Sequence, residues 1–172
     1  MRLVFLVGAA IALPQADGSG CFAAQTPVTL WDGTRRAIAN MSVGDVVRTW
    51  DESRGRPAAA RVLAVTRLWS SEVMDILLED GATRITSTPD HPFWSHGSGR
   101  IVSADPASTK ADYGLEAFMI GANETFADED GRPLRGAVVL GSPAVARQLR
   151  GGGGRREVFT LCLDRHHWFF AH

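Results

Sequence analysis

The chain has few of the residues that identify a metal site or a disulfide-stapled fold. Only two of its 172 residues are cysteine, Cys21 and Cys162, so at most one disulfide can form, which would silence either thiol as a nucleophile. The sequence holds no Cys-x-x-Cys pair, and a zinc site built from Cys162, His166, His167 and His172 would lack a standard spacing. We therefore expect neither a resident metal nor a cofactor.

The chain also lacks an excess of positive or negative charge. The chain carries 18 Lys and Arg against 19 Asp and Glu, for a net charge of -1, and Lys110 is its only lysine. A protein that binds nucleic acid without such an excess would need a basic stripe, and the sequence contains none. We expect no nucleic-acid partner.

No apolar run is long enough to span a bilayer as a helix. Arg2 precedes the eleven apolar residues 3–13, whereas a transmembrane helix needs about 20. With the polar residues 14–20 behind it, this run has the layout of a secretory signal peptide, and residues 1–16 predict export of a domain that does not stay in the membrane. A buried N-terminal strand is the alternative. A lipoprotein signal ending at Cys21 fits less well, because Gly18 stands where an aliphatic residue is expected.

Short strand patterns separated by glycine turns make up most of the remaining chain. Ser142, Pro143 and Gly151 predict one short helix between them, from N-cap to C-terminal stop, and residues 122–132 are rich in Asp, Glu and Gly and predict a surface loop. The chain is thus expected to be a leader, residues 1–20, followed by a single all-β domain, residues 21–172. Strands are predicted at residues 28–31, 37–38, 46–50, 61–69, 73–78, 83–88, 92–94, 101–102, 115–120, 135–140, 158–163 and 168–170.

Several motifs along this domain carry a resemblance when they are taken together. Cys21 opens the stretch Cys-Phe-Ala-Ala-Gln-Thr-Pro-Val, and residues 88–94 read Thr-Pro-Asp-His-Pro-Phe-Trp at the end of an expected hairpin strand. Residues 158–171 read Val-Phe-Thr-Leu-Cys-Leu-Asp-Arg-His-His-Trp-Phe-Phe-Ala. With the turn pairs Asp32-Gly33 and Gly44-Asp45 between them, these motifs resemble the Hint family, the autoprocessing domain of hedgehog proteins, inteins and intein-like proteins.

The resemblance implies a horseshoe-like, pseudo-two-fold β domain that acts once on its own chain. Cys21 would be the nucleophile, and the peptide bond between Gly20 and Cys21 would be the scissile bond. The acyl group of Gly20 would move from the Cys21 nitrogen to its sulfur, giving a thioester that later nucleophiles open easily. Both atoms belong to one residue, so the shift loses no entropy of association.

Three further residues are candidates for assisting this shift. His91 has a side chain that exchanges protons near neutral pH and is placed to protonate the departing amine. Thr88 is expected to hydrogen-bond the scissile peptide or the oxyanion. His167 matches the histidine of the last family motif. Asp90 is interpreted as a turn residue, His96 as exposed, and Cys162 as a small inward-facing hydrophobe.

The expected outcome is cleavage of the N-terminal segment. Splicing in the family needs a terminal Asn, whereas this sequence ends at Ala171 and His172, so splicing is expected only if the chain is C-terminally incomplete. The expected partners are therefore the chain's own N-terminal flanking peptide and an external nucleophile such as water or a thiol. The main alternative is an inactive Hint-like domain that serves as a binding or structural module, and a cysteine peptidase acting on other proteins fits less well.

Overall fold

A computed structural model provides the fold of the chain. It describes residues 4–7, 21–51, 53–79, 84–121, 123–139, 155–165 and 168–172. The strands are β1 (Val4–Val7), β2 (Phe22–Ala23), β3 (Pro27–Thr29), β4 (Arg35–Ala37), β5 (Val46–Asp51), β6 (Arg56–Ser70), β7 (Met74–Leu78), β8 (Arg84–Ser87), β9 (Phe93–Ser95), β10 (Arg100–Ser103), β11 (Phe118–Met119), β12 (Asn123–Ala127), β13 (Pro133–Val139), β14 (Arg156–Leu163) and β15 (Trp168–Ala171). A 3-10 turn, η1 (Ile38–Asn40), and one α-helix, α1 (Pro106–Tyr113), complete the described elements.

The strands form two sheets that share the core. One has seven strands in the order β11-β10-β9-β1-β15-β3-β4, and the other has eight in the order β12-β13-β7-β8-β2-β14-β6-β5. Phenylalanines from both sheets are buried together, among them Phe22 of β2, Phe93 of β9 and Phe169 of β15. The expected all-β architecture is confirmed.

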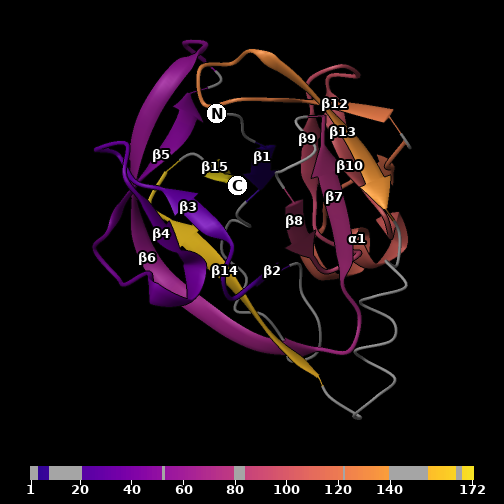
Figure 1. Ribbon diagram of the computed structural model, residues 1–172, viewed down its shortest axis with the longest axis horizontal. Helices are drawn as coiled ribbons and strands as arrows, with labels where there is room; N and C mark the ends of the chain where they lie inside the picture. Colours follow the sequence, from indigo (N-terminus) through magenta and orange to yellow (C-terminus); the bar gives the residue numbers. More distant parts are fainter. Residues whose placement is uncertain are drawn as a thin grey trace.

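The long strand β6 joins the two halves of the molecule. Its first part, up to Arg61, pairs with β5, and its second part, from Val62 to Ser70, pairs with β14. In Figure 1, β6 and β14 run along the bottom of the view and connect the group β3 to β5 with the group β7 to β13, which gives the horseshoe outline.

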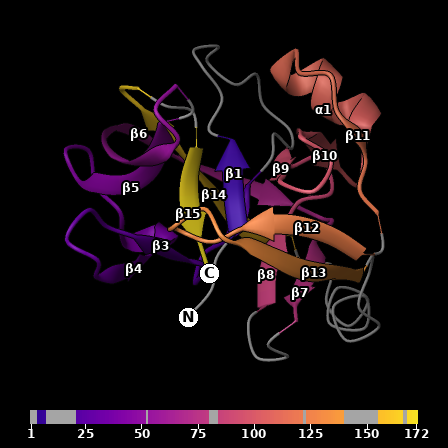
Figure 2. The ribbon, with the colours of Figure 1, turned by 90° about the horizontal axis from the view of Figure 1, so that it is seen from above.

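The N-terminal residues that the structure describes belong to the seven-stranded sheet. Strand β1 pairs antiparallel with β15, from Val4 opposite Ala171 to Val7 opposite Trp168 (Figure 2). Its other edge meets β9, where Leu6 lies opposite Phe93. Residues 4–7 thus form an N-terminal strand that pairs on both edges, and export stays a prediction. Among the described residues, no helix has both the length and the apolar character to cross a membrane.

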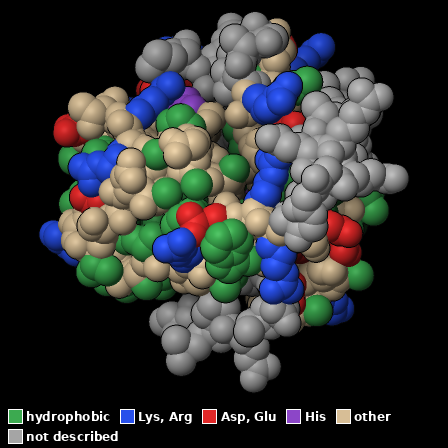
Figure 3. Space-filling model, turned by 60° about the horizontal axis from the view of Figure 1, so that its bottom comes forward, with side chains coloured by type: hydrophobic (Ala, Val, Ile, Leu, Met, Phe, Trp, Pro, Cys, Tyr) green, Lys and Arg blue, Asp and Glu red, His purple; other side chains and the backbone are tan. Residues whose placement is uncertain are grey.

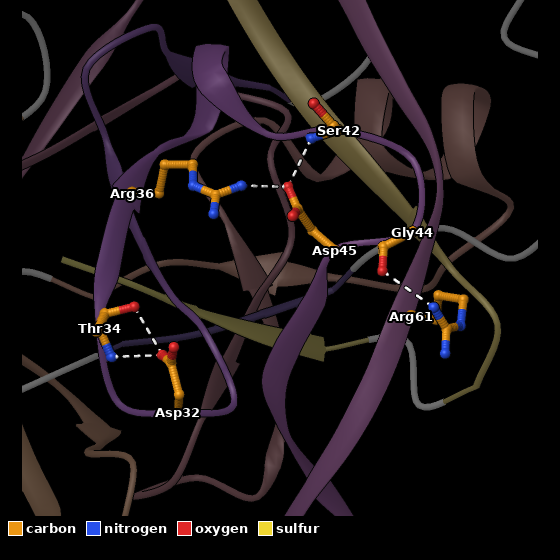
Figure 4. Close-up of polar contacts among 7 residues, drawn as sticks. All are labelled: Asp32, Thr34, Arg36, Ser42, Gly44, Asp45 and Arg61. Atoms are coloured by element: carbon orange, nitrogen blue, oxygen red, sulfur yellow. Dashed lines mark hydrogen bonds and ion pairs between the residues drawn. The ribbon is translucent and has the colours of Figure 1, made fainter.

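Two surface turns hold the strands β3 to β6 in register (Figure 4). Asp32 accepts hydrogen bonds from the backbone N–H and the hydroxyl of Thr34, at 2.9 and 2.6 Å. Asp45 accepts from the backbone N–H of Ser42 and pairs with Arg36, at 2.8 and 2.6 Å. Each aspartate accepts one local backbone N–H, the kind of bond that favours Asp in turns, and also accepts from one side chain. The two turn motifs of the sequence are therefore structural.

Two expectations about the middle of the chain need correction. Residues 122–132 are not a continuous loop, because β12 occupies Asn123–Ala127 and pairs with β13, and Phe126 is fully buried. The polar residues that suggested a loop form the turn after it, where Asp128 accepts the backbone N–H of Arg132 at 2.8 Å. Over residues 115–120, only Phe118–Met119 form a strand.

The described helix lies where none was predicted. Asp105 caps α1 by accepting the backbone N–H of Ser108 at 3.1 Å, Pro106 opens the helix, and Gly114 ends it with φ of +67°. These are standard N-cap and C-cap signals, but Thr109 is the only fully buried helix residue, so no amphipathic pattern marked the segment. The helix predicted near residues 142–150 lies outside the described residues.

Candidate active site

Strand pairing brings Cys21 and Thr88 together. Phe22 of β2 lies opposite Ser87 of β8, so the residues one step out, Cys21 and Thr88, face each other across the same antiparallel pair. The Cys21 N–H donates to the Thr88 hydroxyl oxygen, and the Thr88 N–H donates to the Cys21 carbonyl oxygen, each at 2.9 Å. Both side chains are buried. The N–H bound by Thr88 belongs to the peptide bond between Gly20 and Cys21.

Residues 88–91 form a tight turn that places His91 beside this pair. The His91 N–H donates to the Thr88 carbonyl oxygen at 3.2 Å, and Pro89 occupies the turn position that its fixed φ favours. His91 is fully buried, and its ring centroid lies 4.2 Å from that of Phe22 and 5.0 Å from that of Phe93. Its imidazole therefore packs against two aromatic rings, that of Phe22 in β2 and that of Phe93 in β9.

Residues 104–109, which lead into α1 and form its first turn, hydrogen-bond the backbone of the turn at residues 88–91. The Pro89 carbonyl oxygen accepts the backbone N–H groups of Ala104 and Asp105, both at 3.0 Å. The hydroxyl of Thr109, itself fully buried, lies 2.8 Å from the Asp90 carbonyl oxygen, to which it donates. Two consecutive carbonyl groups of the turn are thus held by residues 104–109.

One buried carboxylate, that of Asp90, acts on the thiol. Burial raises the pKa of Cys21 far above its usual range, and the negative charge of Asp90 raises it further. The pKa of Tyr113, at the end of α1, is raised by burial first and then by the charges of Asp90, Cys21 and Asp112. At neutral pH, Cys21 is therefore a protonated thiol, which attacks only if another group removes its proton as the bond to carbon forms.

A pocket of about 190 Å³ opens beside the turn. Thr88 is one of its lining residues and connects it to Cys21 through the 2.9 Å hydrogen bond. The lining is strongly polar, with four carboxylates and four hydroxyl groups: Ser70, Ser71, Glu72, Thr88, Asp90, Asp105, Ser108 and Asp112, together with Pro89. Small polar molecules have room here next to Thr88.

The predicted site residues divide into those that the structure brings together and those outside it. Cys21, Thr88 and His91 share one site, whereas Gly20 and His167 lie outside the described residues. His96 is exposed, as expected. Cys162 does not face inward: it is half-buried and alternates with the buried Leu161 and Leu163.

The two cysteines of the chain are both free thiols. His172 is buried at the end of β15, where its Nε2 lies 2.7 Å from the Thr29 hydroxyl. Over the described ranges, no three His, Cys, Asp or Glu side chains are grouped to hold a metal ion, and His166 and His167 fall outside those ranges. Basic side chains are interspersed with acidic and hydrophobic ones on the face drawn in Figure 3.

Sequence reasoning missed two neighbours of the thiol. Asp90 is indeed a turn residue, but it is only 5% exposed and its charge acts on Cys21. Tyr113 was not singled out at all. The N-cap Asp105 and the C-cap Gly114 are the sequence signals that would have indicated Tyr113. They mark the two ends of a helix whose last turn carries Tyr113.

No protein-family model and no curated protein sequence matches the chain. Solved structures do: a bacterial intein-like domain from Clostridium thermocellum has a TM-score of 0.61 at 18% identity, covering 88% of this chain and 97% of its own. An Ssp DnaB mini-intein variant has a TM-score of 0.61 at 15% identity, and the match covers 92% of this chain and 97% of the variant. The TvoVMA intein has a TM-score of 0.61 at 14% identity, and the match covers 91% of this chain and 95% of the intein. At such identities the similarity is one of fold.

Proposed function

Because the chain has the fold of inteins and intein-like domains, we propose that it is an autoprocessing domain that acts on its own peptide bond between Gly20 and Cys21. The observation that carries this proposal is the 2.9 Å hydrogen bond from the Cys21 N–H to Thr88. It holds the nitrogen of that peptide bond, buried, beside a thiol in the same residue and a histidine three residues after Thr88.

The reaction begins with transfer of the Cys21 proton to a base, for which His91 is the candidate. The sulfur attacks the Gly20 carbonyl carbon, the carbon–nitrogen bond breaks, and the Cys21 nitrogen takes up a proton, which leaves Gly20 as a thioester on the sulfur. Thr88 positions the departing nitrogen. Water or another nucleophile then opens the thioester, which regenerates the thiol and completes the break in the chain after Gly20. His167 is a candidate helper in the same steps.

The raised pKa of Cys21 supports a particular order of events. Because the resting thiol is protonated, proton removal and sulfur attack are coupled, and the rate of the acyl shift should rise with pH. The pocket beside Thr88 supports entry of a small external nucleophile after the thioester has formed. The polar lining suits water or a small hydrophilic amine or thiol better than an apolar acceptor.

Mass spectrometry of the purified full chain tests the proposal. We expect a time-dependent loss of residues 1–20, faster with added dithiothreitol or hydroxylamine because both open thioesters. Cys21→Ala should abolish this loss entirely, whereas the matched variant Cys162→Ala, which removes the other and half-buried cysteine, should cleave like the wild type. Wild-type protein that is folded yet stays intact in both reagents would show that the chain does not process itself.

The alternative is a Hint-like domain without activity that serves as a binding or structural module. One observation favours it: burial and the Asp90 charge both oppose ionisation of the thiol, as in a site that is no longer used. In that case neither the wild type nor Cys21→Ala should lose residues 1–20 under any condition, and the substitution should alter only the stability of the protein.

A further inference from the structure

Thr109 lies where α1 meets the turn at residues 88–91, and the proposed reaction assigns it no role. Its side chain is fully buried. Its hydroxyl oxygen lies 2.8 Å from the Asp90 carbonyl oxygen, 2.8 Å from the Asp105 carbonyl oxygen and 2.7 Å from the Ser103 hydroxyl oxygen. A hydroxyl group has one hydrogen and two lone pairs, so three polar neighbours are enough to hold it in one orientation. One buried side chain thus joins the helix, the end of β10 and the turn.

The Asp90 carbonyl belongs to the peptide group that links Asp90 to His91. A peptide group is planar and rigid, so its oxygen and its N–H cannot turn independently. Thr109 holds the oxygen, and the N–H, which is that of His91, donates to the Thr88 carbonyl oxygen at 3.2 Å. The preceding peptide group is held as well, because the Pro89 carbonyl oxygen accepts two backbone N–H groups from the segment before α1. These bonds fix the backbone from which the His91 side chain starts.

The geometry points to Thr109 as a positioning residue of the acyl shift, which acts through the peptide group between Asp90 and His91 on the placement of the His91 ring. This inference rests on the proposed function, in which His91 is the candidate base for the Cys21 thiol. A base must lie within hydrogen-bond reach of the proton that it removes, and a misplacement of about 1 Å can cost about a hundredfold in rate. Without the Thr109 hydroxyl, that peptide group loses one of the bonds that hold it, and His91 occupies the reactive position less often.

Thr109→Val tests this role in the full chain, because valine keeps the shape of threonine and removes the hydroxyl. We expect cleavage, followed by mass spectrometry, to reach a plateau rate at high hydroxylamine that is about tenfold lower than in the wild type, because the plateau reports the acyl shift itself. The initial slope against hydroxylamine concentration should not change, since a misplaced base slows the forward and reverse shifts equally. Thr109→Ser, which keeps the hydroxyl, should restore the plateau. A wild-type plateau in Thr109→Val would overturn the inference, and so would an equal decrease of plateau and slope, which indicates partial unfolding.

Thr49 provides a matched control for lost stability. It is also fully buried, and its hydroxyl donates to the Trp168 carbonyl oxygen, so Thr49→Val removes a bond of the same kind. This bond joins β5 to β15, and β5 and α1 lie in opposite halves of the molecule (Figure 1). Both valine variants should lower the urea midpoint, but only Thr109→Val should lower the plateau rate. An equal decrease of the plateau in the two variants would show that the effect comes from stability and would contradict a positioning role.

A second measurement does not depend on cleavage. In the Cys21→Ala background, which cannot form the thioester, amide hydrogen exchange followed by NMR reports how often the His91 N–H leaves the Thr88 carbonyl. We expect this N–H to exchange about tenfold faster when Thr109→Val is added, and at an unchanged rate when Thr49→Val is added. Unchanged exchange with Thr109→Val would show that Thr109 does not hold the turn. A folded wild type that never cleaves would count against the proposed function instead.

Discussion

The turns at residues 32–34 and 88–91 each place an aspartate and a threonine just beyond a strand, but they put these side chains in opposite surroundings. Asp32 is exposed, and its carboxylate accepts two hydrogen bonds from Thr34, which hold its pKa below the usual value. Asp90 is buried, and its charge instead raises the pKa of Cys21. The first aspartate stabilises its own turn, while the second changes the chemistry of a neighbour.

The threonines differ in the same way. The Thr34 hydroxyl donates to Asp32 within its own exposed turn, at 2.6 Å, whereas the Thr88 hydroxyl accepts from Cys21, 67 residues away in the sequence. A threonine bond inside a surface turn stabilises local geometry, and a buried one between distant strands fixes the position of a reacting peptide. Residue type and turn position alone do not separate the two cases; burial does.

The largest expected effect comes from removing the buried hydroxyl. Thr88→Val keeps the shape but leaves the Cys21 N–H without its acceptor, and we expect the cleavage rate to fall about a hundredfold, or roughly 3 kcal/mol of transition-state stabilisation. Thr88→Ser should recover most of the rate. The equivalent change in the surface turn, Thr34→Val, should leave cleavage unchanged. The cleavage rates are measured by mass spectrometry. If Thr34→Val slows cleavage as much as Thr88→Val does, the buried threonine has no special role in the reaction.

The next effect concerns pH. Asp90→Asn removes a negative charge beside Cys21, so the pKa of the thiol should fall, although burial keeps it raised. Each unit of decrease gives about tenfold more thiolate at a pH below the pKa, and the pH–rate profile should move to lower pH. A profile that moves to higher pH would mean that Asp90 assists ionisation, contrary to its position here.

The smallest effect is expected in the exposed turn. The pKa of Asp32 is lowered on folding, so its contribution to stability is present above its unfolded pKa of about 3.9 and disappears as the pH falls through the folded value. Asp32→Asn should therefore lower the urea midpoint slightly at pH 7 and not at pH 2, with cleavage unaffected. A change in cleavage rate in this variant would connect the surface turn to the site.

Part of this site was predictable from the sequence because its signals are local. A strand pattern ending at Thr88 predicts that His91 follows on a turn, and the family resemblance joins both residues to Cys21. The burial of Asp90 and the approach of Tyr113 depend on residues 104–113 packing against that turn. Thr109 is the one fully buried residue of that helix, so no hydrophobic periodicity announces the contact.

Strand β1 lies on the segment that the proposed reaction would separate from the domain, yet it is hydrogen bonded between β9 and β15. Breaking the bond before Cys21 leaves those backbone pairs in place. The product would be a nicked domain of two chains, and dissociation of a central strand, rather than chemistry, would then set when the small fragment is lost. Native and denaturing mass spectra of the same cleaved sample distinguish this from immediate release: a noncovalent complex in the first and two separate masses in the second.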